Sequence, residues 1–238
     1  MFRYPLITAH SGCENTCPNT LDSIMLGIHS EADIIEADVR STEDEVVILS
    51  HNDYIEVPCH GKFYFSDHKY EEIKARYPQI VRLEDIFEMI RSNNKMLNLD
   101  LKDDAVTVPA LEIVKVRNML DYVIFTGCEC EKASYITQRY KGTRVLLNSQ
   151  DDMIKHSDVN YKDFIHKTYK DAVGSACCGI NISFDACFAD FIDFMTVRFM
   201  PVSVYTIDDA ETMKKYINMG AYSITTNCIR MLSSIVRS

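Results

Sequence analysis

The sequence predicts an α/β protein with one domain over residues 1–238, a (β/α)8 TIM barrel with a small insertion after the second barrel strand. Short apolar segments typical of strands alternate with amphipathic segments typical of helices, and eight such units follow one another along the 238 residues. The alternative is an open doubly wound sheet. No glycine-rich dinucleotide or phosphate-binding fingerprint favours that fold.

The first half of the chain contains an excursion from this alternation. The acidic turn at 43–45 is too short for a helical crossover, so the apolar segment after it is predicted to form a hairpin-like strand. Residues 52–80 mix aromatic and charged residues with prolines, and we expect an inserted loop with little regular structure. Asn19 or Thr20 is suited to cap the first helix. The expected strands are 6–10, 32–40, 46–50 and 96–101, and the expected helices are 19–30, 71–77 and 83–92.

The second half alternates regularly. Pro109 is well placed in the first turn of a helix, where its missing N–H costs nothing. The expected strands are 122–126, 144–148, 180–184, 201–207 and 222–226, and the expected helices are 109–120, 129–140, 150–171, 188–197, 208–219 and the segment from residue 229.

Composition limits the partners. A net charge of −10 argues against nucleic acid as a partner, and no apolar run is long enough to span a membrane. The N-terminal residues do not resemble a secretory signal. Nine cysteines without framework spacing are most simply reduced thiols, which predicts a cytoplasmic location. The pairs Cys13/Cys17 and Cys128/Cys130 could instead bind metal or form disulfides; we favour small, semi-buried side chains. The sequence does not indicate an oligomeric state.

Two apolar strands carry charged residues where a buried strand should carry none. Glu36 and Asp38 lie within the segment 34–39, and Asp100 and Lys102 lie at the end of the segment 96–102. Because side chains alternate faces along a strand, each pair points the same way. Burying isolated carboxylates is costly unless a cation or dense hydrogen bonding offsets the lost hydration. Three carboxylates in such positions predict a divalent metal site.

Two histidines follow other apolar strands. His10 ends the first strand and His51 directly follows the segment 46–50. In a barrel these strand ends meet at one rim, where active sites lie. Carboxylate oxygens suit Mg²⁺, Ca²⁺ or Mn²⁺, and two imidazoles can exchange protons near neutral pH, so the set fits phosphodiester hydrolysis. Each residue alone has an ordinary structural explanation, and only their joint placement indicates a site.

These residues also carry a resemblance to a known family, the glycerophosphodiester phosphodiesterases. The family patterns are His-Arg-Gly, Pro-Glu-Asn-Thr, Gly-Ala-Asp-x-Ile-Glu-x-Asp-Val, His-Asp and Glu-x-Lys, with later strands Val-Trp-Thr-Val-Asn and Ile-Thr-Asp. The similar segments here are His10-Ser-Gly, Asn19-Thr-Leu, Ala32 to Val39, Val47 to His51 and Asn98 to Lys102, with weaker matches at Val204 to Asp208 and Ser223 to Asn227.

The resemblance implies a metal-dependent barrel hydrolase that splits glycerophosphodiesters, a small-molecule substrate, into glycerol 3-phosphate and an alcohol. By position it implies metal ligands at Glu36, Asp38 and Asp100, and an acid–base histidine pair at His10 and His51. Which histidine is the acid stays open. The residues implied to contact the substrate are Lys102, Ser11 and Tyr205.

The chain departs from the family pattern at several of these positions. Ser11 stands where the family has a phosphate-contacting arginine, and Pro18 where it has a glutamate. Asn52 replaces the aspartate after the second histidine, Asp100 replaces a glutamate, and Tyr205 replaces a tryptophan. These changes leave the reaction class in place and the substrate open.

Two alternatives follow from these features. The first is a catalytically silent barrel that binds a phosphorylated ligand or a metal, suggested by Ser11 and Pro18. The second is a lysophospholipase-D-like or sphingomyelinase-D-like enzyme that uses the aromatic residues of the 52–80 insertion as an apolar surface. For those aromatic residues a place in the folded core is the simpler expectation.

Overall fold

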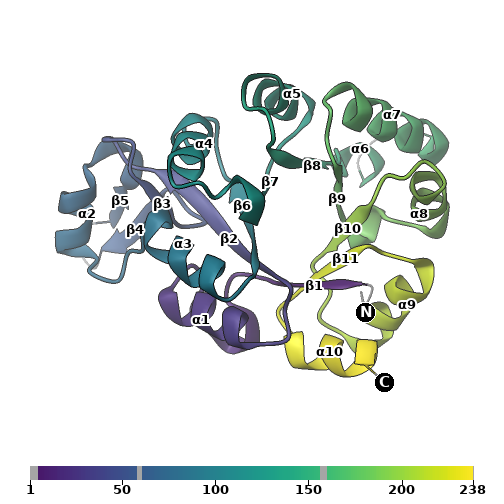
Figure 1. Ribbon diagram of the computed structural model, residues 1–238, viewed down its shortest axis with the longest axis horizontal. Coiled ribbons are helices and arrows are strands. Elements are labelled where there is room, and N and C mark those ends of the chain that lie inside the picture. Colours follow the sequence, from purple (N-terminus) through teal and green to yellow (C-terminus); the bar gives the residue numbers. More distant parts are fainter. Residues whose placement is uncertain (1–4, 58–60, 156–159, 238) are drawn as a thin grey trace.

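The computed structural model describes residues 5–57, 61–155 and 160–237, and its centre is a closed barrel of parallel strands (Figure 1). The first barrel strand pairs with the last one and also with the second, which closes the ring. The predicted TIM barrel is confirmed. The barrel strands are β1 (Leu6–Ala9), β2 (Ile34–Ser41), β6 (Met96–Leu101), β7 (Val123–Thr126), β8 (Arg144–Asn148), β9 (Gly179–Ser183), β10 (Val202–Tyr205) and β11 (Ser223–Thr226).

Helices surround the barrel and cover the outward side of its strands (Figure 1). Their apolar side chains form one continuous core with the strands, in which Ala37, Leu99 and Phe125 are fully buried. α4 begins two residues before Pro109, so the proline does lie in the first turn. The helices of the ring are α1 (Leu21–His29), α3 (Leu83–Ser92), α4 (Thr107–Val116), α5 (Cys130–Arg139), α6 (Asp152–Lys155), α7 (Tyr161–Gly174), α8 (Ala189–Thr196), α9 (Ala210–Met219) and α10 (Ile229–Arg237).

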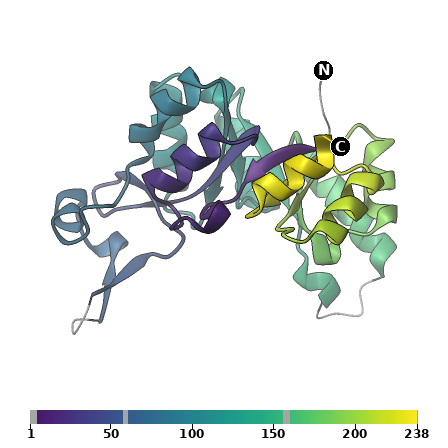
Figure 2. The same cartoon turned by 90° about the horizontal axis from the view of Figure 1, so that it is seen from below.

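The excursion after β2 is more regular than the sequence suggested. β2 runs past the barrel and its end pairs antiparallel with β3 (Val47–Leu49), as expected for a hairpin-like strand. The prediction of little regular structure over 52–80 is wrong, because β4 (Tyr54–Val57) and β5 (Gly61–Tyr64) pair antiparallel before α2 (Tyr70–Arg76). Residues 58–60 lie outside the described residues. Figure 2 shows this blue β4–β5 ribbon extending away from the barrel.

This excursion has a small core of its own. Phe65 and Ile73 are almost completely buried, and Phe63 is 8% exposed. They pack with Ile48 and Tyr70 in a cluster separate from the barrel core. The expectation that aromatic residues of the insertion serve a folded core is therefore confirmed for Phe63 and Phe65, while Tyr64 is exposed.

For its described residues, the structure bears on the predictions about membrane-spanning segments and about the cysteines. Across the described ranges, no helix combines the length and apolar character needed to cross a bilayer. Cys13 and Cys128 are buried free thiols, and Cys17 is an exposed one. The Cys128 Sγ–H donates to the carbonyl of Thr126 at 3.3 Å, so this side chain is a packed part of the rim.

Candidate active site

Two neighbouring barrel strands bring the acidic residues together. In the pairing of β2 with β6, Asp38 lies opposite Asp100 and Glu36 lies opposite Asn98. One carboxylate oxygen from each of Glu36, Asp38 and Asp100 lies within 4.8 Å of the others. Over the described part of the chain, this is the one group of three or more acidic, histidine or cysteine side chains placed to share an ion. Parallel strands thus produce the predicted cluster.

Glu36 is the most deeply placed of the three carboxylates. Its side chain is held by the backbone N–H of Ser11, which donates to Oε2 at 2.7 Å. Burial raises the pKa of Glu36 well above its ordinary value, and the charge of Asp38 raises it further, whereas the Ser11 hydrogen bond works in the opposite direction. A charged Glu36 is therefore disfavoured at this buried position unless a cation lies beside it.

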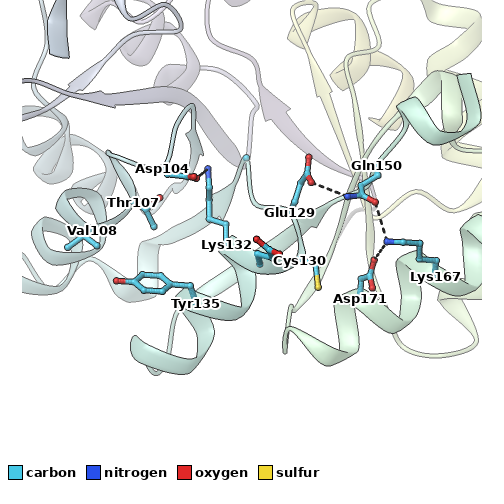
Figure 3. Close-up of a pocket in the computed structure, with 12 residues that line it drawn as sticks. Asp104, Thr107, Val108, Glu129, Cys130, Lys132, Tyr135, Gln150, Lys167 and Asp171 are labelled. Atoms are coloured by element: carbon cyan, nitrogen blue, oxygen red, sulfur yellow. Dashed lines mark hydrogen bonds and ion pairs between the residues drawn. The ribbon is translucent and has the colours of Figure 1, made fainter. Parts of the chain in front are cut away.

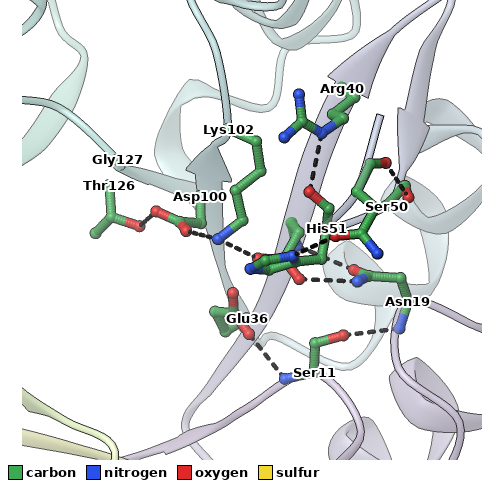
Figure 4. Close-up of polar contacts among 12 residues, drawn as sticks. Ser11, Asn19, Glu36, Arg40, Ser50, His51, Asp100, Lys102, Thr126 and Gly127 are labelled. Atoms are coloured by element: carbon green, nitrogen blue, oxygen red, sulfur yellow. Dashed lines mark hydrogen bonds and ion pairs between the residues drawn. The ribbon is translucent and has the colours of Figure 1, made fainter. Parts of the chain in front are cut away.

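Asp38 is held by two hydrogen bonds with the side chain of Asn19, which Figure 4 shows beside the site. The Asn19 side-chain amide donates to Asp38 Oδ2 at 2.8 Å, and its oxygen accepts the backbone N–H of Asp38 at 3.0 Å. Asn19 sits in the left-handed region with φ 58°, a conformation that asparagine tolerates better than most residues. Its own N–H donates to the hydroxyl of Ser11 at 2.7 Å. The cap of α1 is instead Thr20, whose hydroxyl accepts from the N–H of Ser23.

Lys102 joins the two aspartates of the cluster. Its Nζ lies 2.7 Å from Asp38 Oδ1 and 2.5 Å from Asp100 Oδ2. Burial lowers the pKa of Lys102, but the charges of Asp100 and Asp38 outweigh burial, so the net shift is upward and the ammonium stays charged. On the other side, the Thr126 hydroxyl donates to Asp100 Oδ1 at 3.0 Å. Gly127 must lack a side chain, because a Cβ there would lie 2.4 Å from the carbonyl oxygen of Leu101.

His10 is supported by the closure of the barrel. It follows β1, and its Nδ1 lies 3.0 Å from the side-chain oxygen of Asn227, which follows β11. The backbone N–H of Asn227 and its side-chain Nδ2 donate to Asp208 at 2.7 and 2.9 Å. A pair separated by 217 positions in sequence is thus adjacent in the fold.

His51 is supported by the excursion instead. The preceding residue, Ser50, donates its N–H to the carbonyl of Asp38 at 3.0 Å, which brings the histidine to the rim. His51 Nδ1 lies 3.1 Å from the side-chain oxygen of Asn52, and its carbonyl accepts from Arg40 Nε at 2.9 Å (Figure 4). Arg40 also bonds Asp103 at 2.7 Å, and His51 itself is exposed.

These side chains line a common cavity of ≈ 340 Å³ at the carboxyl ends of the barrel strands. Tyr205 forms part of its wall, and burial together with the charge of Asp151 raises the pKa of its phenol. Ser11 lies behind Glu36 and is not among the lining residues, although its backbone contacts the site. The lining residues are His10, Glu36, Asp38, His51, Asn98, Asp100, Lys102, Thr126, Asn148, Asn181, Tyr205, Thr206 and Thr225.

A larger hollow of ≈ 990 Å³ lies outside this rim, alongside α4, α5 and α7 (Figure 3). Its lysines are paired: Lys132 lies 3.0 Å from Asp104, and Lys167 lies 2.6 Å from Asp171. It contains none of the side chains of the acidic cluster. The volume of a hollow alone therefore does not identify the candidate site, and the smaller cavity is the one that contains the acidic cluster.

Several supporting residues could be identified from the sequence only in part. Asn19 is a possible helix cap and lies in a segment that resembles the family pattern, but neither observation pairs it with Asp38. The sequence does not indicate a role for Arg40 or Thr126. Asp208 and Asn227 stand in segments that resemble family strands, but nothing in their local sequence pairs them with a histidine. Their roles depend on contacts between strand ends that lie far apart in the sequence. The hydrophobic periodicity of a sequence does not indicate such contacts.

Comparison with known proteins shows the family to which the chain belongs. The model of the glycerophosphoryl diester phosphodiesterase family matches residues 10–231. A glycerophosphodiester phosphodiesterase of Caldanaerobacter subterraneus subsp. tengcongensis is 26% identical over 129 residues, an alignment spanning 49% of this chain and about half (53%) of that protein. One from Bacillus altitudinis is 22% identical over 238 residues, covering 93% of this chain and 94% of its own.

A solved structure shares the fold over its full length. An Oleispira antarctica phosphodiesterase, in complex with the product sn-glycerol-3-phosphate, is 17% identical, with a TM-score of 0.80 and coverage of 100% of this chain and 98% of its own. At this identity the likeness concerns the fold, while the family model matches nearly the whole sequence. The chain belongs to the glycerophosphoryl diester phosphodiesterase family of enzymes.

Proposed function

We propose that this protein hydrolyses glycerophosphodiesters to glycerol 3-phosphate and an alcohol, with one divalent cation and a pair of histidines. The observation that carries the proposal is the carboxylate cluster of Glu36, Asp38 and Asp100, which shares one cavity with His10 and His51. Family membership supports the reaction class, and the related Oleispira phosphodiesterase holds glycerol 3-phosphate as its product.

The residues present fit a hard divalent cation. The three carboxylates lie beside the ammonium of Lys102, and burial, followed by the charge of Asp38, raises the pKa of Glu36. A cation next to Glu36 would favour its charged form. An all-oxygen donor set suits Mg²⁺, Ca²⁺ or Mn²⁺. Bound among Glu36, Asp38 and Asp100, such an ion would supply polarisation of a phosphoryl oxygen.

The side chains of this chain supply the other requirements of the reaction. Lys102 keeps its positive charge beside the cavity, where it can contact a phosphate oxygen and stabilise charge that develops in the transition state. One imidazole accepts a proton from the attacking nucleophile and the other donates one to the leaving alkoxide. Tyr205 forms a wall for the substrate, and Ser11 orients Glu36 through its N–H.

Removal of metal and of one ligand tests the proposal. Glycerophosphocholine, glycerophosphoethanolamine and glycerophosphoinositol are offered to the protein, and release of glycerol 3-phosphate is measured before EDTA, after EDTA and after readdition of each cation. We expect activity to stop with EDTA and to return with at least one cation. Glu36→Gln, which keeps the shape and removes the charge, is expected to abolish the return.

The matched control is Glu88→Gln, a change of the same kind at an exposed position of α3. It is expected to keep full activity. Turnover that persists in EDTA, or in Glu36→Gln, would refute the metal site.

The same assay separates the two alternative functions. A silent barrel would show cation-dependent binding of glycerophosphodiesters without turnover. A lysolipid hydrolase would turn over the lysolipid parent faster than the deacylated diester. The structure offers little apolar surface for the latter from Phe63 and Phe65, because both are buried in the core of the excursion.

A further inference from the structure

Three strand ends of the barrel rim come together around His10. His10 follows β1, Asn227 follows β11 and Asp208 lies three residues after β10. The pairing of Ala9 with Thr226 places the next residue of each strand side by side. The carbonyl of Thr226 accepts the N–H of His10 at 3.0 Å, and Ile207 donates its N–H to Thr225 at 3.0 Å. The three side chains are therefore held by strand ends rather than by a flexible loop.

The direction of the Asn227 side chain is determined by its second partner. A carboxylate only accepts hydrogen bonds, so the amide nitrogen of Asn227 must face Asp208 Oδ2, at 2.9 Å. The side-chain oxygen is then left facing His10 Nδ1, at 3.0 Å. Asp208 is itself fixed, although exposed, because Oδ1 also accepts the backbone N–H of Asn227 and the hydroxyl of Thr226, at 2.7 and 3.1 Å.

An amide oxygen beside Nδ1 decides which imidazole nitrogen carries the proton. This oxygen can only accept, so Nδ1 carries the hydrogen and Nε2 of the neutral ring keeps its lone pair. We propose that Asn227, aligned by Asp208, is the positioning residue of His10 and holds it as the Nδ1–H tautomer with Nε2 available for proton transfer in the cavity. The catalytic consequence rests on the proposed function.

The pair of Asn227 and Asp208 consists of one amide and one carboxylate in contact. Replacing Asn227 by aspartate would place two carboxylates side by side, and their repulsion would break the pair.

Four variants test the assignment through activity. Asn227→Ala and Asp208→Ala are expected to lower kcat, on the scale of about 10- to 100-fold that supporting partners of functional side chains usually cost, with KM little changed. Asn227→Asp is expected to lower kcat because it faces Asp208, and adding Asp208→Asn to it is expected to recover most of the loss. Recovery by exchange would show that the contact itself matters, and the ring spectra of His10 then separate a positioning role from a merely structural one.

The control is Asp209→Ala, which removes the neighbouring carboxylate. Asp209 caps α9 by accepting from the N–H of Thr212 at 2.9 Å, so this variant is expected to lose some thermal stability and no kcat. Ring ¹⁵N spectra of His10 supply a readout that does not need turnover. The wild-type ring is expected to carry its proton on Nδ1, and Asn227→Ala is expected to shift protonation toward Nε2.

The outcomes separate this inference from the proposed function. A wild-type protein without turnover, or a His10→Ala variant with full kcat, would contradict the proposed function, and the ring spectra would still decide the tautomer. An inactive His10→Ala beside an Asn227→Ala variant with wild-type kcat would overturn the positioning role. So would a wild-type His10 ring protonated on Nε2.

Discussion

The two histidines of the cavity have the same kind of partner and very different support. In each case Nδ1 faces an asparagine side-chain oxygen, at 3.0 Å for His10 and 3.1 Å for His51. The partner of His10 is bound by a carboxylate on a third strand end, whereas the partner of His51 is its exposed neighbour, Asn52. The half of the site that contains His10 therefore depends on closure of the barrel, whereas the half that contains His51 depends on the local excursion.

The largest effect is expected from removal of either imidazole. His10→Ala and His51→Ala should each lower kcat by roughly 10²- to 10⁴-fold, the usual contribution of a general acid or base. The measurement is kcat for glycerophosphodiester hydrolysis at saturating cation. His29→Ala, at the exposed end of α1, is the control and should be unchanged. Full activity in one of the two variants would show that only one half of the site is catalytic.

A smaller effect is expected where the excursion is tied to the barrel. Arg40→Ala removes the hydrogen bond to the His51 carbonyl and the contact with Asp103, so kcat should fall several-fold. Stability should fall by no more than about 1 kcal/mol, because the ion pair is partly solvated. Kinetics and thermal unfolding measure the two effects.

The control for this variant is Arg82→Ala, which breaks ion pairs with Glu84 and Asp85 at the start of α3. It should change stability by a similar amount and leave kcat unchanged. Equal kcat values for the two variants would mean that the Arg40 contact does not position His51.

The smallest effect is expected at Asn52. Because this side chain is exposed, water can replace its oxygen, and Asn52→Ala should change kcat by no more than about 2-fold, the equivalent of the ~0.5 kcal/mol typical of surface changes. Compared with Asn227→Ala in the same assay, it measures how much barrel support adds. An equal loss of kcat in the two asparagine variants would show that His10 and His51 do not differ in how much their partners support catalysis.

The barrel strands were predictable because their signals are local. Segments such as Ile34 to Val39 and Met96 to Leu101 are short, apolar and separated by helical periodicity, and the structure confirms them as β2 and β6. The β4–β5 pair was not predicted because its strands carry mixed aromatic and charged side chains and are stabilised by a separate small core. The local sequence pattern does not indicate that these residues pack into a separate core.

The residues of the candidate site also differ in whether the local sequence predicts them. Glu36, Asp38 and Asp100 could be anticipated because charge within an apolar strand is anomalous in the sequence itself. The contact between His10 and Asn227 could not, because it depends on the two ends of the fold meeting across 217 positions. The catalytic roles of these residues stay predictions for the experiments above.

Closure of the ring by β11 has a consequence for the order in which the site is completed during synthesis. The carboxylates of β2 and β6 precede β11 along the chain, so Asn227 is synthesised after them. A ribosome-bound nascent chain that has not yet emerged past β11 contains the acidic residues and both imidazoles, but His10 lacks its partner. The ring of His10 therefore gains the partner proposed to position it only after the last barrel strand has joined the sheet.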